Sequence, residues 1–435
     1  MLKKDCNCNM YNLLINKKHI YSLLSLVLIG IVFLFNLNGL MNYNAFALRC
    51  GLLLTLGLIL VSYIVLGLEL ITYIIFCIEM LLAPLTIQFY TGKSYGLLSK
   101  NIVQLYYPQF VVYTFLYCIM FLSVNIFFQY SKYEEQLIHI KYLDYSDLNV
   151  YFNNFIAIIF TIVAFPRLSL NVASTERFSM LLPGHAWNQL AIIALIFNLP
   201  HLKDRWSVKL VYLFTIMWFL FNGERADITG LILGISVYSL LKNKEKIKHI
   251  NFLKKVMYAL IIVLFILFLN YLAFLRNGQK ISFVNNIRNI LVTPTTSDVA
   301  YIFNVVIDYV NKFPLTNGEI FKQNLLSIIP FYNNSFFGNL VSASYPYPGG
   351  EPWLAQPLLD WGILGLVIGS LLDFIILRLI TLKSNTFFKM EYIAMLCLVP
   401  RAVWYGRSYT FTTLVFFVPM MYLMNRFIFK YSERS

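Results

Sequence analysis

Apolar segments about as long as a lipid bilayer is thick recur along this 435-residue chain. A membrane-spanning helix needs about 20 mostly apolar residues, and the sequence supplies that length repeatedly. Charged residues make up 12% of the chain, about half the proportion found in soluble domains. The sequence therefore predicts an all-α polytopic integral membrane protein. Its basic, polar start leads into a first apolar run, which we expect to be a retained helix rather than a cleaved signal peptide.

Threading these segments across a bilayer predicts about twelve spans, with both chain ends on the inner side. A lysine cluster at residues 242–255 sets this orientation, because inner loops carry an excess of positive charge. The net charge of +14 therefore sets topology and does not indicate nucleic-acid binding. The predicted spans lie at about residues 20–38, 46–67, 69–90, 107–128, 150–165, 185–199, 208–221, 228–241, 257–274, 359–379, 391–404 and 409–427.

A long outer segment between the ninth and tenth spans divides the chain into three parts. Residues 1–274 hold the first nine spans, residues 275–358 form a large external loop, and residues 359–435 hold the last three spans. The external loop is too long for an ordinary connection. Within it, residues 293–313 carry apolar side chains at helical spacing, which predicts an amphipathic helix on the membrane surface or over a cavity.

The later part of this loop, residues 329–353, interleaves aromatic side chains with Asn, Gly and Pro. Such a composition suits sugar rings, which stack on aromatic faces and present hydroxyl groups for hydrogen bonding. It is equally typical of a rigid, packed loop with ordinary interfacial aromatics. The sequence leaves both interpretations open, and Trp353 is the aromatic residue that we select as a candidate substrate contact.

Arginine and lysine are distributed differently across the predicted membrane. The threading places about eight of twelve Arg but about five of twenty-two Lys outside, whereas the positive-inside rule treats the two alike. Arg differs from Lys in its planar fork, which binds phosphate and carboxylate groups in a bidentate way. The outer Arg excess predicts a protein that holds phosphate-bearing substrates at the outer face of the membrane.

A compact charged turn, Gly223-Glu224-Arg225-Ala226-Asp227, joins the seventh and eighth predicted spans on the outer side. Gly lets the backbone approach a ligand closely, and the start of the next helix adds a dipole that favours an anion. Arg225 is therefore a candidate anion ligand. Glu224 or Asp227 is a candidate general base or a partner that holds the guanidinium group. An interfacial salt bridge or a helix cap explains the same residues.

Arg401 and Arg407 offer two cations around one short outer turn between the last two spans. Several arginines that converge on a pyrophosphate would stabilise it as a leaving group. Other outer arginines that could join them are Arg167, Arg177, Arg276 and Arg288. Contact with lipid headgroups is the alternative explanation, above all for Arg276 and Arg288.

The sequence also contains isolated polar residues within or beside its spans, and it lacks several motifs of known enzyme classes. Glu79 and Asp373 lie mid-span, where they indicate either a proton or ion path or buried structural partners. His185 is a candidate acid or base, or a helix cap. The six cysteines show neither a disulfide framework nor zinc spacing. No Walker motif, metal-ligand cluster or serine nucleophile elbow is present, so we expect neither a metal nor a cofactor.

The order of these features resembles Wzy-type O-antigen polymerases, also called oligosaccharide repeat-unit polymerases. The resemblance covers roughly residues 150–425. It rests on Gly223-Glu224-Arg225 at an outer helix end, on Pro348-Gly349-Gly350-Glu351-Pro352 at the end of the loop, on Leu358-Leu359-Asp360-Trp361-Gly362-Ile363-Leu364-Gly365 after it, and on the turn from Arg401 to Arg407.

The resemblance implies a membrane glycosyltransferase of GT-C-like architecture at the outer, periplasmic face of the bacterial inner membrane. Such enzymes transfer the growing glycan from its undecaprenyl diphosphate to a new lipid-linked repeat unit, without metal or nucleotide. A flippase and a chain-length regulator are the implied partners. The match carries over Arg225 and one of Arg401 or Arg407 as diphosphate or transition-state ligands, and Arg167 with less support. By position, Glu351 and Asp360 are candidates for sugar binding or for a general base.

Three other functions compete with this interpretation. O-antigen ligases use the same lipid-linked donor with a different acceptor. A flippase or transporter of the same lipid would act without chemistry, and transporters often show internal repeats and broken helices; the sequence shows no clear repeat. A membrane acyltransferase would be expected to present a catalytic His in or near the membrane, and His185 is a poor candidate for that role.

Overall fold

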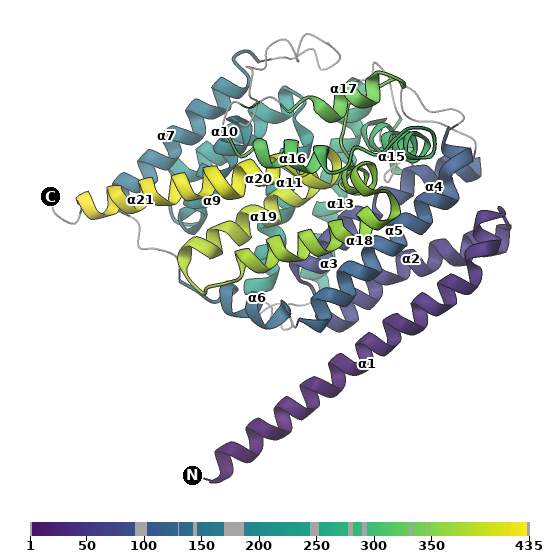
Figure 1. Cartoon of the computed structure of the whole chain (residues 1–435). Coiled ribbons are helices and arrows are strands. Elements are labelled where there is room, and N and C mark those ends of the chain that lie inside the picture. The colour runs from purple at the N-terminus through teal and green to yellow at the C-terminus, as the bar shows by residue number, and fades with distance from the viewer. Residues whose placement is uncertain are drawn as a thin grey trace.

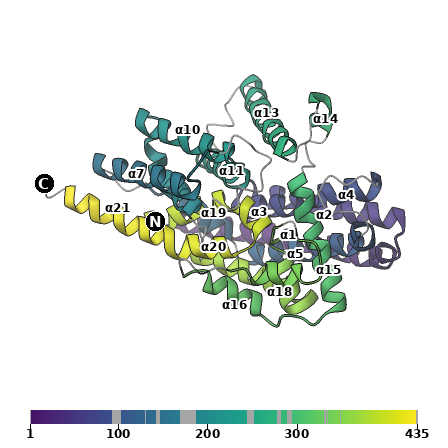
Figure 2. The same cartoon turned by 90° about the horizontal axis from the view of Figure 1, so that it is seen from above.

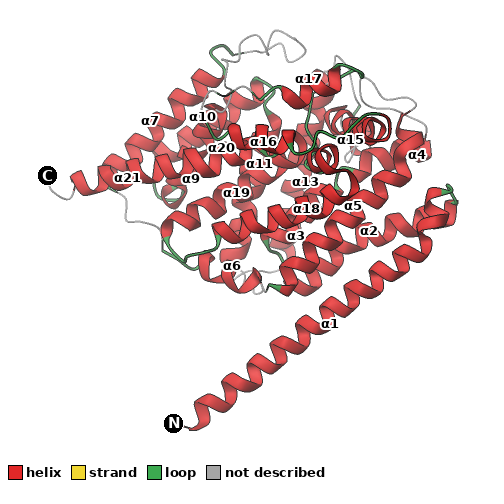
Figure 3. Cartoon of the chain, in the orientation of Figure 1, coloured by secondary structure: helices red, strands yellow, loops and turns green. Residues whose placement is uncertain are grey.

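The computed structural model describes residues 2–91, 102–128, 130–141, 146–168, 187–243, 252–276, 282–288, 294–329, 332, 334–347 and 349–432. Within these ranges the chain forms helices and connecting turns, with no strand (Figures 1 and 3). By length and apolarity, seven of the described helical segments are able to cross a membrane. The chain is therefore an all-helical, polytopic membrane protein, and the total of about twelve spans stays a prediction.

The seven candidate spans differ in how much of their surface the rest of the protein covers. The first, Ile20–Met41, is mostly exposed to its surroundings, whereas Leu70–Thr91 is mostly buried. Figure 1 shows the first helix diverging from the body of the protein along much of its length. The candidate spans are Ile20–Met41, Ala45–Leu66, Leu70–Thr91, Tyr106–Phe127, Asp147–Ala164, Ala355–Ile380 and Ser408–Lys430.

The helices of the first half follow the predicted spans closely at several ends. Helix α7 begins at a capping box, in which Ser146 and Asn149 satisfy each other's backbone amides. The bounds are α1 (Leu2–Met41), α2 (Ala45–Leu66), α3 (Leu70–Glu79), α4 (Leu82–Thr91), α5 (Ile102–Phe127), α6 (Tyr130–Ile138), α7 (Asp147–Ala164), α9 (Trp187–Asn198), η1 (Leu199–His201), α10 (Trp206–Phe221) and α11 (Arg225–Lys242).

The second half contains the remaining helices, and α13 and α14 lie to one side of the body in the view from above (Figure 2). The bounds are α13 (Phe252–Arg276), α14 (Phe283–Arg288), α15 (Pro294–Lys312), α16 (Glu319–Leu326), α17 (Phe336–Ser342), α18 (Ala355–Ile380), α19 (Thr386–Tyr405), α20 (Ser408–Thr412), the π-helical η2 (Thr413–Phe417) and α21 (Val418–Ser432).

Each predicted span overlaps a described helix, but five of these helices fall outside the set that is long and apolar enough: α9, α10, α11, α13 and α19. Helix α9 has only 12 residues, whereas a membrane-spanning helix needs about 20. Its residues Asn188–Phe197 are all buried, so this short helix is enclosed by protein on every side. A helix that is covered all round belongs to the core of the bundle rather than to its lipid-facing surface.

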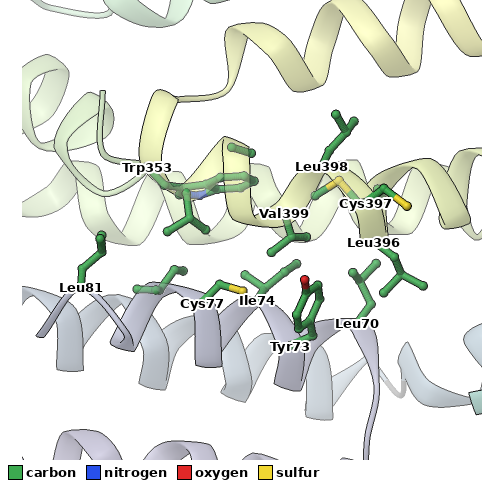
Figure 4. Close-up of a cluster of buried hydrophobic side chains, with 14 of the residues drawn as sticks. Leu70, Tyr73, Ile74, Cys77, Leu81, Trp353, Leu396, Cys397, Leu398 and Val399 are labelled. Carbon is green, nitrogen blue, oxygen red and sulfur yellow. The ribbon is translucent and has the colours of Figure 1, made fainter. Parts of the chain in front are cut away.

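The centre of the protein is the packing of α3 and α11 against α19. Figure 4 shows Leu70, Ile74 and Cys77 of α3 facing Leu396 and Val399 of α19, and all of these side chains are buried. The side chain of Trp353 closes the same cluster at one end (Figure 4). This apolar contact holds α19, which carries Arg401 near its last turn, at a defined depth among its neighbours.

Helix α15 occupies the range in which the sequence predicts an amphipathic helix. Its apolar residues, including Val299, Ile302 and Phe303, are buried against α4, α5 and α18. Asp308 of α15 accepts hydrogen bonds from the hydroxyl groups of Tyr106 in α5 and Tyr345 in the outer segment. The helix therefore covers the bundle and ties the outer segment to it.

The N-terminal part of α18 bends where the outer segment enters it. Gly362 has a φ of +63° and interrupts the helix together with Trp361, a conformation that Gly adopts at little cost. Just before the bend, both carboxylate oxygens of Asp360 accept hydrogen bonds, from the Thr316 hydroxyl and from the backbone amides of Ile320 and Phe321. The bend thus anchors α16 onto α18.

Candidate functional site

The candidate site begins with an unusually close contact between α11 and α19. Gly230 and Gly234 of α11 lie directly against the backbone of Cys397 in α19, so that a Cβ atom at Gly234 would be 2.6 Å from the Cys397 nitrogen. Small residues four positions apart allow two helix backbones to approach in this way. This contact brings the first turn of α11 beside the last turns of α19, because Asp227 precedes Gly230 and Arg401 follows Cys397 by one turn each.

Arg401 is the centre of the resulting ion-pair cluster. Its Nη1 donates a hydrogen bond of 2.9 Å to Oε1 of Glu224 and a second one to Oδ2 of Asp227. The side chain of Arg401 is 9% exposed and that of Asp227 only 2%. Asp227 also accepts a hydrogen bond from the Asn188 amide of α9. Two carboxylates and one guanidinium group are therefore buried together, where ionised groups persist only when paired.

Two tyrosines lie over the same guanidinium group. The Cζ atom of Arg401 is 4.3 Å from the ring centroid of Tyr409 and 5.4 Å from that of Tyr405. The Nε–H of Arg401 is buried and has no hydrogen-bond partner among the described residues. Because buried donors are almost always paired, this atom marks a place where a ligand or water would bind. The cluster thus combines a fixed cation with an available donor.

Arg407 lies in a second buried network, in which protein groups accept hydrogen bonds from all of its guanidinium nitrogens. Its Nε and Nη2 donate to the two carboxylate oxygens of Asp373 at 2.9 and 2.6 Å. Its Nη1 donates to the backbone carbonyl of Trp353 at 2.7 Å. The Asp373 carboxylate also accepts from the Tyr117 hydroxyl and the Trp353 indole. The Arg407 guanidinium donates from all three nitrogens to protein acceptors, an arrangement typical of a structural ion pair.

The end of the outer segment binds the last turn of α19 through its backbone. The amide of Glu351 donates to the Trp404 carbonyl, and that of Trp353 donates to the Val403 carbonyl, both at 3.0 Å. The Glu351 carboxylate accepts one hydrogen bond, of 3.1 Å, from the Gln356 amide. A side chain at Gly406 would overlap both groups, so glycine is required at this turn.

Burial raises the pKa of the Glu351 carboxyl from 4.5 to about 8, and the hydrogen bond from Gln356 offsets this only in part. Burial also raises the pKa of the nearby Tyr347 hydroxyl, and the charges of Glu351, Tyr409 and Tyr405 raise it further. Glu351 and the tyrosines around Arg401 therefore share one electrostatic environment. A carboxyl with a pKa near neutrality is suited to proton transfer.

The other predicted site residues lie at several different places in the chain. Asp360 uses both carboxylate oxygens to hold α16, and Arg167 is exposed at the end of α7. Arg225 is half-buried and is the first residue of α11, directly after Glu224. Arg276 and Arg288 end α13 and α14, and their side chains are not described. Arg177 and His185 lie outside the described residues.

The mid-span acids have different surroundings. Asp373 is the partner of Arg407, which supports the structural alternative for this residue. Glu79 is buried at the end of α3, where neither carboxylate oxygen has a hydrogen-bonding nitrogen or oxygen partner among the described residues; the Cys118 thiol lies beside it. In the described part of the chain, no three His, Cys, Asp or Glu side chains gather in a way that could hold a metal ion.

Sequence reasoning missed several members of the site. Tyr405 follows Arg401 by four positions on α19, a spacing that places two side chains on one face of a helix. Tyr409 lies beyond the break at Gly406, in α20, so helical spacing does not predict its contact with Arg401. The spacing of Gly230 and Gly234 was a further signal in the sequence, because small residues at this spacing mark close helix contacts. No sequence pattern predicts the contact between Asn188 and Asp227, because it depends on how α9 packs against α11.

Comparison of the chain with protein-family models, with curated proteins and with solved structures finds no match. The resemblance to O-antigen polymerases therefore stays a prediction that rests on the residues quoted for it.

Proposed function

We propose that this protein polymerises undecaprenyl-diphosphate-linked oligosaccharide repeat units at the periplasmic face of the bacterial inner membrane. The observation that carries the proposal is the buried Arg401, whose Nε–H has no partner among the described residues, at the end of α19 to which the backbone of Glu351 is bonded. Arg225 begins α11 directly after Glu224, a partner of Arg401, and burial raises the pKa of the Glu351 carboxyl. These groups come from α11, α19 and the outer segment. A lipid diphosphate leaving group and an acceptor hydroxyl need such donors and such a base.

The reaction forms one glycosidic bond and breaks one bond to phosphate. The acceptor hydroxyl oxygen attacks the anomeric carbon of the donor glycan, the bond from that carbon to the diphosphate oxygen breaks, and lipid diphosphate leaves with the electron pair. The hydroxyl proton passes to the Glu351 carboxylate. Arg225 and the Nε–H of Arg401 bind the diphosphate oxygens, where charge-assisted hydrogen bonds are strong.

Glu224 and Asp227 act as positioning residues in this scheme. Both carboxylates bind the same Nη1 atom of Arg401, which holds the guanidinium group in one orientation. The remaining Nε–H edge then points in a fixed direction before the substrate arrives. Donors that are preorganised in this way stabilise developing charge without reorganising during the reaction.

The experiment is a gene deletion complemented with wild type, Arg225→Ala or Glu351→Gln, followed by gel analysis of surface polysaccharide. We expect a ladder with wild type and a single-repeat band with either variant, at equal protein levels on an immunoblot. Arg205→Ala is the matched control, because Arg205 pairs with Asp147 at the opposite end of α10. An unchanged ladder in the deletion strain would contradict the proposed polymerase function.

Transport of the same lipid-linked glycan is the second candidate, and one observation favours it. The segment Leu70–Thr91 is interrupted between α3 and α4, next to the buried Glu79, and broken helices with midplane polar groups are a feature of transporters. Loss of every repeat-bearing band in the deletion strain would support a flippase or a ligase. Accumulation of lipid-linked repeats on the cytoplasmic leaflet would then distinguish the flippase.

A further inference from the structure

The short helix α14 has its apolar and polar side chains in the reverse of the order found on a helix at a water-facing surface. Phe283, Val284 and Ile287 are all exposed, the first of them by 66%, whereas Asn286 is only 4% exposed. A surface helix in water turns its apolar stripe to the core and its polar residues outward. The reversed pattern indicates that the medium around the apolar face of α14 is itself apolar.

Asn286 fixes α14 to the preceding helix, α13. Its Nδ2 donates a hydrogen bond of 2.9 Å to the Leu267 carbonyl, and its Oδ1 accepts one of 2.8 Å from Nδ2 of Asn270. Asn270 is buried as well. Amide side chains that bond between two helices satisfy their polar groups where water is absent. The chain therefore returns alongside α13 after leaving its end, as the view from above shows (Figure 2).

These two anchor points set the depth of α14. The sequence predicts that the span in α13 ends on the outer side near Phe274. Leu267 and Asn270 lie seven and four residues before that end, which corresponds to about 6–11 Å at the helical rise of 1.5 Å per residue. Interfacial helices bury their apolar face about 5–10 Å into the boundary between headgroups and acyl chains. Asn286 thus holds α14 at the depth that suits such a helix.

The exposed surface of α13 indicates what covers α14. Exposed apolar side chains run along α13 from Met257 to Tyr271, a length of about 21 Å. The hydrocarbon core of a bilayer is about 30 Å thick, so this row covers most of its depth. Lipid covers a row of this length, whereas a docked protein segment would cover a local patch. The row includes Leu260, Leu264 and Phe268 at a spacing of four residues.

We propose that α14 is embedded in the outer leaflet of the membrane, where Phe283, Val284 and Ile287 contact the acyl chains of lipids. Asn285 is also exposed, and the helical turn of about 100° per residue places it on the opposite side from these three, toward water. The proposal does not rest on the proposed polymerase function. It moves residues 283–288 from the predicted external loop into the membrane boundary.

The test is spin-label accessibility of the purified full-length protein in vesicles of phosphatidylethanolamine and phosphatidylglycerol. A nitroxide is attached to Val284→Cys, Ile287→Cys or Asn285→Cys, and labelled wild-type protein gives the background of the native cysteines. Oxygen concentrates in the hydrocarbon of a bilayer, whereas a neutral nickel chelate stays in water. We expect oxygen to relax the labels at positions 284 and 287 more strongly than nickel does, and the label at position 285 to show the reverse.

Asn285→Cys is the matched control, because it tests the same helix on its other side. All three positions are exposed, so the substitutions remove little packing, and thermal unfolding checks that each labelled variant is folded. Positions 284 and 287 also give two independent readings of one face, so that the loss of one variant leaves the other.

Two results overturn the proposal. Nickel relaxation at positions 284 and 287 as strong as at position 285 would place α14 in water. Weak relaxation by both reagents would show that protein covers this face instead of lipid. Neither result bears on the polysaccharide ladder, so a ladder that is unchanged in the deletion strain contradicts the polymerase function and leaves the placement of α14 intact.

Discussion

Gly234→Ala tests whether the close approach of α11 and α19 holds the Arg401 cluster together. A Cβ atom at Gly234 would lie 2.6 Å from the Cys397 nitrogen and 2.7 Å from its Cα. These are backbone atoms of the neighbouring helix, so no side-chain rotation relieves the overlap. The two helices must move apart, and Asp227 and Glu224 move with α11 away from Arg401.

The magnitude follows from a comparison of two glycines. Overpacking a well-packed contact costs about 1–3 kcal/mol. Gly57→Ala in α2 is the matched control, because a Cβ atom there meets nothing within 4 Å. Replacing Gly by Ala inside a helix stabilises it by up to ~1 kcal/mol, and this gain applies to both variants. Their difference in free energy of unfolding therefore isolates the overpacking cost, and we expect about 1–3 kcal/mol.

The assay is unfolding of the purified variants in mixed micelles with increasing SDS, together with the polysaccharide ladder of complemented cells. A displacement of about 1 Å near reacting groups can reduce catalysis about 100-fold, so Gly234→Ala should lose most of its ladder while Gly57→Ala keeps it. Equal stability of the two variants and a full ladder for Gly234→Ala would refute the proposed role of this helix contact.

Three more variants test other parts of the structure. Arg401→Ala leaves two buried carboxylates without their cation, so we expect a loss of about 3–5 kcal/mol in SDS unfolding; an unchanged midpoint would contradict the burial of this cluster. Asn425→Ala removes three side-chain hydrogen bonds to α7, at ~0.6 kcal/mol each, so it should lose about 2 kcal/mol, whereas the exposed Asn42→Ala should lose nothing. The raised pKa of Glu351 favours its neutral form in the folded protein, so wild-type stability should fall as the pH rises from 4.5 to about 8. Glu351→Gln should flatten that decline, and parallel stability curves would show that Glu351 does not cause it.

The sequence was most informative about where apolar helices lie. Helix α2 spans Ala45–Leu66 against a predicted 46–67, because the length of an apolar run directly reflects the bilayer. The predicted span at 69–90 matches the candidate span Leu70–Thr91, within which a turn separates α3 from α4. Pro84 offers a physical reason, since proline cannot donate to the carbonyl four residues earlier, and that carbonyl belongs to Met80, where α3 gives way to α4.

The sequence does not predict which acidic residue pairs with which arginine. Two outer arginines on one turn, Arg401 and Arg407, have similar sequence surroundings but separate networks. Arg401 meets carboxylates of α11 through the glycine contact, and Arg407 meets Asp373 through the packing of α18. Which acid lies opposite which arginine depends on helix rotation and depth, and these are set by side-chain packing between segments far apart in the chain.

Among the side chains that the structure describes, Arg401 and Arg407 lie in separate networks and do not form one positively charged cradle for a diphosphate. Arg401 contributes one positive charge and its partners Glu224 and Asp227 contribute two negative ones, a formal sum of −1, and the neighbouring Arg225 brings this sum to 0. In the proposed reaction, diphosphate would therefore be selected by the direction of fixed donors rather than by net charge. This arrangement has a consequence for turnover. A strongly positive site would bind the released lipid diphosphate as tightly as the donor, and such uniform binding does not accelerate the chemical step. A neutralised site with a few oriented donors favours the charge that develops during bond cleavage and still lets the product leave.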